Sequence, residues 1–383
     1  MQRLKDITQV SLKLGLIGFG GPAAHLAMLE EEVVTRRQWL DRSRFLDLMG
    51  ATNLVPGPNS TQMVLHVGYI HAGLLGLILS GVAFLMPATL ITGIFAWIYV
   101  SFGDLPQIEP LFYGIKPAVL AVILGALWKL GKKAVKSYPI FLIGVAVAIL
   151  LLLGINEVIA LLIGGIVGML FLMFLPYLPK NSAEVLIGGI SVGTILKVAA
   201  STATTVTPSV WKLGLFFLKV GSILFGSGYV LIVFLEGELV NQNGWLTQQQ
   251  LLDAIAIGQL TPGPLLSTAT FIGYVILGLP GAIISTIAIV FPSFILVFAL
   301  NPVIPKLRSS KWTSAFLDAI NISAVALMII VTLQLAQTLF LNPLDYIAIL
   351  IFAVGAIAQF RFQMGALWLV LGGAILGLIL QSL

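Results

Sequence analysis

The chain has 383 residues, of which 59% are hydrophobic and only 9% are charged. Soluble domains carry about 25% charged residues, so the composition excludes a soluble protein and indicates a chain whose solvent is lipid. The absence of cysteine excludes a disulfide framework, a thiolate nucleophile and a thiolate metal site. The net charge of +5 is not gathered in a basic run, and the three histidines lack metal-ligand spacing. We therefore expect no nucleic acid partner, no metal and no cofactor.

Long apolar runs recur along the chain, and a membrane helix needs roughly 20 such residues. Runs of suitable length occur at 73–100, 110–128, 138–154, 157–176, 277–300, 314–338, 344–360 and 364–382. Less regular runs cover 7–28, 45–70, 209–234 and 250–275. Lys13 interrupts the first of these, so we interpret the N-terminus as a membrane segment rather than a cleaved signal peptide. The pattern predicts an all-α polytopic membrane protein with about 10–12 membrane segments.

Two of the less regular runs contain the same helix-breaking tripeptide, Pro56-Gly57-Pro58 in one and Pro262-Gly263-Pro264 in the other. Proline has no backbone N–H, so each tripeptide should end a helix. Backbone groups freed at membrane depth are tolerated only where protein or a water-filled cavity satisfies them. Proline also suits the first turn of a new helix. Each tripeptide therefore predicts a stop, a turn and a restart beside a cavity.

The two tripeptides belong to an internal repeat, because residues 12–58 align without a gap on residues 218–264. Apolar bias cannot supply many of the identities, which include Lys13 with Lys219, Phe19-Gly20 with Phe225-Gly226, Trp39 with Trp245 and Asp47 with Asp253. The later apolar runs follow in the same order. We therefore divide the chain into an N-terminal repeat at 1–180, a linker at 181–208 and a C-terminal repeat at 209–383.

Loop charges place the two repeats in opposite orientations, since cytoplasmic loops collect Lys and Arg and exported loops avoid them. Four arginines of loop 30–44 become neutral amides in the equivalent loop 236–250: Arg36, Arg37, Arg42 and Arg44 are replaced by Gln242, Asn243, Gln248 and Gln250. In the next loop pair, 101–110 has no Lys or Arg whereas 301–311 has three. In the pair after that, the first repeat has four lysines between 129 and 136 and the equivalent loop near 338–345 has none. We expect loop 30–44 to be cytoplasmic and loop 236–250 external, which makes the halves an inverted-topology repeat, as in many secondary transporters.

The number of full crossings depends on the interrupted run at 45–70. An odd number of crossings must join the cytoplasmic loop to the external loop at 101–110, yet two runs lie between them. We therefore expect 45–70 to enter the membrane and return, which leaves about five crossings per half. An additional span near 185–200 would restore the parity in another way, although Lys197 makes it a poor span.

Inverted halves would point two restarted helices at one cavity near the midplane. A helix N-terminus carries about half a positive charge and binds oxyanions well. The expected substrate-binding residues are those of the breaks and restarts together with two lysines: Lys13, Phe19, Gly20, Gly21, Pro56, Gly57, Pro58, Asn59, Ser60, Thr61, Lys219, Phe225, Gly226, Pro262, Gly263, Pro264, Ser267 and Thr268.

Several of these residues allow two interpretations. Lys13 and Lys219 occupy equivalent apolar positions, where they would suit a dianion or would each snorkel to an interface. The glycine-rich stretches at 18–22 and 225–228 form either close-packing surfaces or a second break that lines the cavity.

Five charged residues are candidates for gating or coupling: Glu30, Asp47, Lys116, Glu236 and Asp253. The acids recur at equivalent positions of the two repeats, as gate ion pairs would, or a proton site if transport is proton-coupled. Helix capping explains Asp47 and Asp253 equally well. For Lys116 the alternative is a packing or interfacial role.

Together, these motifs resemble the chromate ion transporter family in its long, two-domain form. The resemblance is densest over 11–92 and 214–299, where FGGPAAHLAMLEEEVV and NLVPGPNSTQ are paired with FGSGYVLIVFLEGELV and IGQLTPGPLLST. It implies a bacterial inner-membrane protein that exports chromate, confers chromate resistance and is subject to competition by sulfate.

The resemblance also assigns residues 19–22, both Pro-Gly-Pro turns, Asn59, Thr61 and Gln62 to the family signature. Two positions depart from it, because Asn53 stands where a glutamine is expected and Ser227 replaces a glycine. Both replacements are small and polar, so they bear on selectivity more than on fold.

The leading hypothesis is a secondary transporter of a tetrahedral oxyanion, chromate first and sulfate-like anions second. Its partners are the lipid bilayer and, as one option, a second copy of the chain. A passive anion channel with the same cavity is the main alternative. An enzyme is disfavoured because no ionisable residues besides the twinned acids form an obvious nucleophile–base pair and the supposed site is duplicated. No ATP-binding P-loop occurs either.

Overall fold

The computed structural model describes residues 1–19, 21–53, 55–103, 109–175, 207–225, 228–300, 310–341 and 344–381. Apart from an isolated bridge between Leu341 and Leu344, the regular structure of these residues is helical. The alternative span near 185–200 and most of the expected linker lie outside the described residues.

The two repeats have equivalent α- and π-helices in the same order, and the second also has two short 3₁₀ turns. The first has α1 (Gln2–Ile17), α2 (Pro22–Glu30), the π-helix η1 (Glu31–Arg36), α3 (Arg42–Thr52), α4 (Asn59–Phe102), α5 (Glu109–Ala134), α6 (Tyr138–Leu152) and α7 (Glu157–Phe174). The second has α9 (Val210–Ile223), the 3₁₀ turn η4 (Gly228–Val230), α10 (Leu231–Phe234), the π-helix η5 (Leu235–Gln242), α11 (Gln248–Leu260), the 3₁₀ turn η6 (Leu265–Ser267), α12 (Thr268–Leu300), α14 (Lys311–Leu341), α15 (Tyr346–Phe362) and α16 (Ala366–Gln381). Even the two π-helices occupy equivalent positions.

A second break lies inside α4, at the boundary between the expected runs 45–70 and 73–100, and it recurs in α12. Gly73 has φ 68° and ψ −156°, and Gly278 has φ 64° and ψ −152°. Residues other than glycine rarely adopt these backbone angles. Each glycine follows a residue that is also non-helical, so the break spans two residues in both repeats.

The chain reverses direction at this break. Eight residues of straight helix span about 12 Å, yet a Cβ added at Gly68 would collide with the carbonyl of Gly76, and one added at Gly76 would collide with the carbonyl of Gly68. Gly273 and Gly281 approach each other in the same way in α12. Both restarted helices therefore fold back as hairpins whose arms meet at paired glycines.

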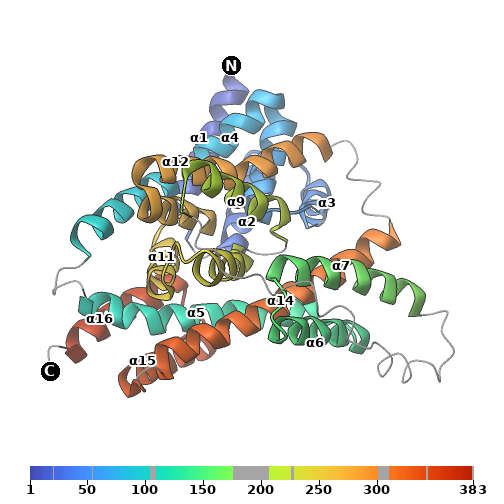
Figure 1. The fold of residues 1–383 in the computed structure, drawn as a ribbon. Helices are drawn as coiled ribbons and strands as arrows, with labels where there is room; N and C mark the ends of the chain where they lie inside the picture. The colour runs from blue at the N-terminus through green and yellow to red at the C-terminus, as the bar shows by residue number, and fades with distance from the viewer. Residues whose placement is uncertain are drawn as a thin grey trace.

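The helices form two layers, each of which contains helices from both repeats (Figure 1). In one layer α1 packs on α4, α9 packs on α12, and α4 packs on α12. In the other, α15 and α16 pack on α5 while α6 and α7 pack on α14. The short α2 and α11 lie between the layers (Figure 1). The repeats of the sequence are therefore interleaved in space.

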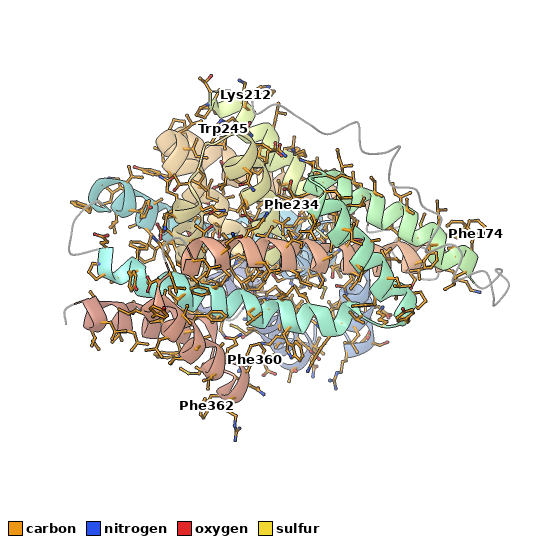
Figure 2. All side chains as sticks on the ribbon, turned by 60° about the horizontal axis from the view of Figure 1, so that its bottom comes forward. Phe174, Lys212, Phe234, Trp245, Phe360 and Phe362 are labelled. Atoms are coloured by element: carbon orange, nitrogen blue, oxygen red, sulfur yellow. The ribbon has the colours of Figure 1, made fainter. Side chains whose placement is uncertain are left out.

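The outer surface is apolar, as expected for a multi-pass membrane protein. Five of the described helices are long and apolar enough to cross a membrane: α4, α5, α7, α12 with the preceding η6, and α14. The apolar helices α6, α15 and α16 are shorter. Figure 2 shows Phe174 and Phe362 at the periphery and Phe234 near the centre; the first two are exposed and the third is buried.

We predict that Gly76→Ala lowers the free energy of unfolding by about 1–3 kcal/mol, because the new methyl group enters a fully packed backbone crossing. The control is Gly372→Ala, since a Cβ at that position of α16 meets no atom within 4 Å. Thermal unfolding of the purified variants in detergent measures both. Equal unfolding temperatures for the two variants would contradict the crossing.

Candidate functional site

The first helix of each repeat ends abruptly near the middle of the molecule. In the first repeat α1 ends at Ile17, Gly21 has a φ of 77°, and α2 begins with Pro22. In the second, α9 ends at Ile223 and helical structure resumes at Gly228. Of the two interpretations of the glycine-rich stretches, the structure therefore shows the break. Gly20 and Gly226 lie outside the described residues.

Each break is joined to the Pro-Gly-Pro turn of the other repeat. The N–H of Gly57 donates a hydrogen bond to the carbonyl of Leu224 (2.5 Å), and the N–H of Gly263 donates to the carbonyl of Gly18 (2.9 Å). Gly18 and Leu224 directly follow α1 and α9, so their carbonyls are groups that a continuous helix would have bonded. The two repeats thus exchange the backbone hydrogen bonds that their own breaks leave unmade.

The helices that restart after these turns have no side-chain cap. Pro58 precedes α4 and Pro264 precedes η6, and at neither start does a side chain accept a hydrogen bond from the first turn. The first N–H groups of a helix have no partner within the helix. Both restarts therefore present backbone N–H groups that can donate hydrogen bonds to a bound anion.

Both restarts and both first-helix breaks border one cavity of about 40 Å³. It is lined by Gly21, Pro22, Pro58, Ser60, Gly228, Tyr229, Gly258, Gln259, Thr261, Gly263, Pro264, Leu265, Leu266 and Ala366. We call it the central cavity. Its lining includes no charged side chain, so any anion held there must be bound by N–H groups, amides and hydroxyls.

The most informative polar residue of the central cavity is Gln259, which was not in the expected binding set. Its Oε1 accepts a hydrogen bond from the hydroxyl of Tyr229 (3.4 Å), whereas its buried Nε2 has no hydrogen-bond partner among the described residues. An amide N–H₂ without a partner is a donor available to a ligand. Thr261 and Tyr229 were also missed. The signal that could have found Gln259 is its position just before the second Pro-Gly-Pro, equivalent to Asn53.

The twinned lysines form ion pairs away from the central cavity. Lys13 Nζ lies 2.6 Å from Glu32 Oε1, and Lys219 pairs with Glu238 in the same way. Glu32 and Glu238 belong to the two π-helices. Hydrogen bonds from Lys13 and Arg37, together with the charges of both, lower the pKa of the Glu32 carboxyl, which lies in the expected cytoplasmic loop. Neither lysine is among the residues lining the central cavity.

Two other expected residues, Asn59 and Phe225, line a second cavity of about 150 Å³. Asn53, Lys133, Lys136 and Asn321 also line it, and Lys136 is paired with Asp318 at 2.6 Å. We call it the lysine cavity. It lies beside the first Pro-Gly-Pro, at the basic end of α5.

The remaining expected binding residues that the structure describes are not among those that line the central cavity. Thr61, Ser267 and Thr268 are buried, and Phe19 is exposed. Pro56 and Pro262 begin the two turns.

The candidate gating residues differ between the repeats. Asp253 of α11 is buried; it lies 3.4 Å from Lys116 Nζ and accepts a hydrogen bond from the hydroxyl of Tyr99 (2.9 Å), both from the first repeat. Its equivalent Asp47 is exposed. Glu30 lies 3.3 Å from Arg42, whereas Glu236 is fully buried.

Helix capping does not explain Asp47 and Asp253, so that interpretation is wrong. Thr247 caps α11 through a reciprocal pair of bonds with Gln250. At the start of α3, the N–H of Arg44 donates to Asp41 Oδ1 at 2.7 Å. The caps are therefore the equivalent residues Asp41 and Thr247, each six residues before the aspartate in question.

A multi-pass helical membrane protein with a duplicated, interleaved fold and a small internal cavity bordered by broken helices has the architecture of a membrane transporter. The chain belongs to the chromate transporter family, whose pattern matches residues 5–169 and 211–378.

Individual relatives extend over most of the chain. A probable chromate transport protein of Synechococcus elongatus is 33% identical, over 84% of this chain and 81% of its own. The chromate transport protein of Cupriavidus metallidurans is 30% identical, over 99% of this chain and 94% of its own. An uncharacterized transporter of Methanocaldococcus jannaschii is 29% identical, over 85% of this chain and 82% of its own. No solved structure matches the chain.

We predict that Glu32→Gln destabilises the protein at neutral pH by about 1.5–3 kcal/mol, since it removes the charged partner of hydrogen bonds from Lys13 and Arg37. The pKa of Glu32 is lowered in the folded state, so the stabilisation is complete above the ordinary glutamate pKa and disappears as pH falls through the lowered value. Unfolding temperatures measured in detergent at decreasing pH should therefore converge for the wild type and the variant.

Glu31→Gln is the control for this comparison, because the ion pair of Glu31 with Arg36 lies at an exposed site. It should change stability little at any pH. A gap between the wild type and Glu32→Gln that persists at low pH would contradict the ion-pair explanation.

Proposed function

We propose that this protein transports a tetrahedral oxyanion, chromate in the first place, out of the bacterial cell across the inner membrane. The observation that carries the proposal is the central cavity, where uncapped helix starts of both repeats meet. Family membership supports an anion substrate, and two of the relatives described above are named as chromate transport proteins, which supports chromate.

Binding would rest on dipoles rather than on a cation. The backbone donors after Pro58, the amide of Gln259 and the hydroxyls of Ser60 and Thr261 border the central cavity. Helix N-termini stabilise anions without a neighbouring lysine. A neutral site of this kind releases its dianion more readily than an ion pair would, which a transporter requires.

The lysine cavity provides the route from the cytoplasm in this proposal. Lys133 and Lys136 stand at the end of α5 that carries the inside-positive charge pattern, and Asn59 connects this cavity to the restart at Pro58. A basic, partly open cavity raises the local concentration of anions. Rocking of the two inverted halves would then expose the central cavity to each side in turn.

Two alternatives keep the same cavity. The first is a transporter of sulfate or another inorganic anion, because backbone donors recognise tetrahedral oxyanions in general. The second is a passive anion channel. Saturable flux that increases with anion on the opposite side indicates a carrier, whereas a linear, non-saturating current indicates a pore.

We predict that the purified protein in liposomes gives saturable flux of labelled chromate that excess sulfate suppresses. Gln259→Glu should reduce this flux about tenfold or more, because it replaces an amide donor of the cavity with a carboxylate that repels the anion. The matched control is Gln250→Glu, the same replacement in the same helix, where glutamate preserves the capping box with Thr247.

Both variants are first checked for an intact, monodisperse state in detergent. Equal chromate flux in Gln259→Glu and Gln250→Glu would disprove the central cavity as the anion site. Flux of sulfate without flux of chromate would retain the site and change the substrate.

We also predict that equivalent positions of the two repeats face opposite sides of the membrane. Since the chain has no cysteine, Arg36→Cys and Gln242→Cys each create a single thiol without further changes. A membrane-impermeant maleimide should label Gln242→Cys in intact spheroplasts, and Arg36→Cys only after the membrane is opened. Labelling of both from one side would contradict the inverted topology.

A further inference from the structure

Glu236 is a fully buried carboxyl group that forms no ion pair with any residue that the structure describes. Its side chain lies in the π-helix η5 with a relative exposure of 0%. Oε1 accepts one hydrogen bond from Gln248 Nε2 (3.2 Å), and Oε2 has no hydrogen-bond partner among the described residues. Burying an unpaired carboxylate is costly, so such a group tends to hold a proton.

The equivalent residue of the first repeat is paired differently. Glu30 is partly exposed and lies 3.3 Å from Arg42 Nε. Gln248 replaces this arginine in the second repeat, so the amide that bonds Glu236 stands where a cation stands beside Glu30. The replacement of arginines that indicates an external loop therefore also removes the counter-charge of Glu236.

A second carboxyl group from the other repeat approaches the same π-helix. Glu157 begins α7, and a Cβ added at Gly237 would collide with its carboxyl atoms. The residue equivalent to Gly237 is Glu31, so glycine in the second repeat makes room for the approaching acid. Glu236 lies in the expected external loop, and the pKa of its carboxyl group is raised to about 7, mainly by burial. The negative charge of Glu157 contributes to this rise in pKa, and the hydrogen bond from Gln248 opposes it.

Within the described parts of the chain, the other groups that contact η5 do not supply a free cation. Lys219 of α9 is paired with Glu238. From α11 the facing polar group is Gln248, and from α14 it is Thr338, whose hydroxyl donates to Gln248 Oε1. Thr338, Gln248 and Glu236 thus form a chain of neutral donors that ends on the carboxyl group.

A polar cavity connects this region with water. It has a volume of about 270 Å³, and its lining includes Glu157, Gly237, Asn241, Gln242 and Gln334. A cavity of this size holds many waters, since one water needs only about 10–15 Å³. Protons can therefore reach Glu157 and the surface of η5 from solvent.

The same helical run leads from Glu236 to the anion site. The segment from Leu231 to Gln242 is continuous through α10 and η5, and it directly follows Gly228 and Tyr229, which line the central cavity. A change of charge at Glu236 thus acts on the element that borders the anion.

We propose that Glu236, with Glu157 beside it, is a proton-binding site that couples anion export to proton uptake from the external side. The proton bonds to a carboxylate oxygen of Glu236 and leaves to water, and no electron is transferred. This inference rests on the proposed transport function. An entering proton and a departing dianion both move positive charge inward, so the inside-negative membrane potential drives both.

The test measures chromate flux and proton movement together in liposomes, with a pH-sensitive dye in the external solution. In the wild type, protons should move opposite to chromate, and flux should change as pH passes through about 7. Glu236→Gln should lose both proton movement and the pH dependence of flux. The control is Glu31→Gln, at the exposed pair with Arg36, which should retain both.

Glu157→Gln tests the effect of the neighbouring charge. It also provides a test of the proposal if Glu236→Gln fails to insert into the membrane. Removing a negative charge beside Glu236 should shift the pH profile to lower pH. Unchanged proton movement and an unchanged profile in Glu236→Gln, or an unshifted profile in Glu157→Gln, would overturn the proposal.

Infrared difference spectroscopy of the purified protein separates this inference from the proposed function, because it needs no transport. A carboxylic acid C=O band that titrates near pH 7 in the wild type and is absent in Glu236→Gln supports the proton site, even if no anion flux is found. Absence of the band from the wild type overturns the site, even if chromate flux is robust.

Discussion

Backbone groups freed from a helix inside an apolar medium must find protein partners, and the rest of this structure depends on how that requirement is met. The carbonyls of Gly18 and Leu224, left free where the first helix of each repeat ends, accept hydrogen bonds from Gly263 and Gly57 of the opposite repeat. Neither repeat can satisfy its own break. The two halves are therefore held together at the point where each is interrupted, and the central cavity lies at that point.

The shared backbone supports two different sets of side chains. Lys13 with Glu32 and Lys219 with Glu238 are equivalent pairs that anchor the two π-helices to the first helix of each repeat. Beyond these pairs the repeats diverge, since the first keeps an arginine beside its glutamate and the second has an amide. The two repeats therefore share a symmetric backbone frame around the central cavity but differ in the charges near their equivalent glutamates.

Some features of the candidate site were readable from the residues alone. Proline and glycine act locally, so the breaks at Pro56–Pro58 and Pro262–Pro264 were predicted at the right positions. The break at Gly73 falls at the boundary between two of the expected runs, but the close approach of Gly68 and Gly76 beside it appears only in the structure. Gln259 occupies a signature position before the second Pro-Gly-Pro, but only the structure shows that it lines the central cavity with an unbonded amide nitrogen.

The sequence by itself determined the membrane class, the duplication and the positions of the breaks, because apolar content, repeated residues and proline chemistry are local properties. Only the tertiary structure decided which break meets which. It showed that α15 and α16 pack on α5 while α6 and α7 pack on α14, and that Lys13 is paired with an acid rather than placed in the cavity. Contacts between distant segments depend on how the whole chain packs. The local properties of a sequence do not determine which of the possible contacts form.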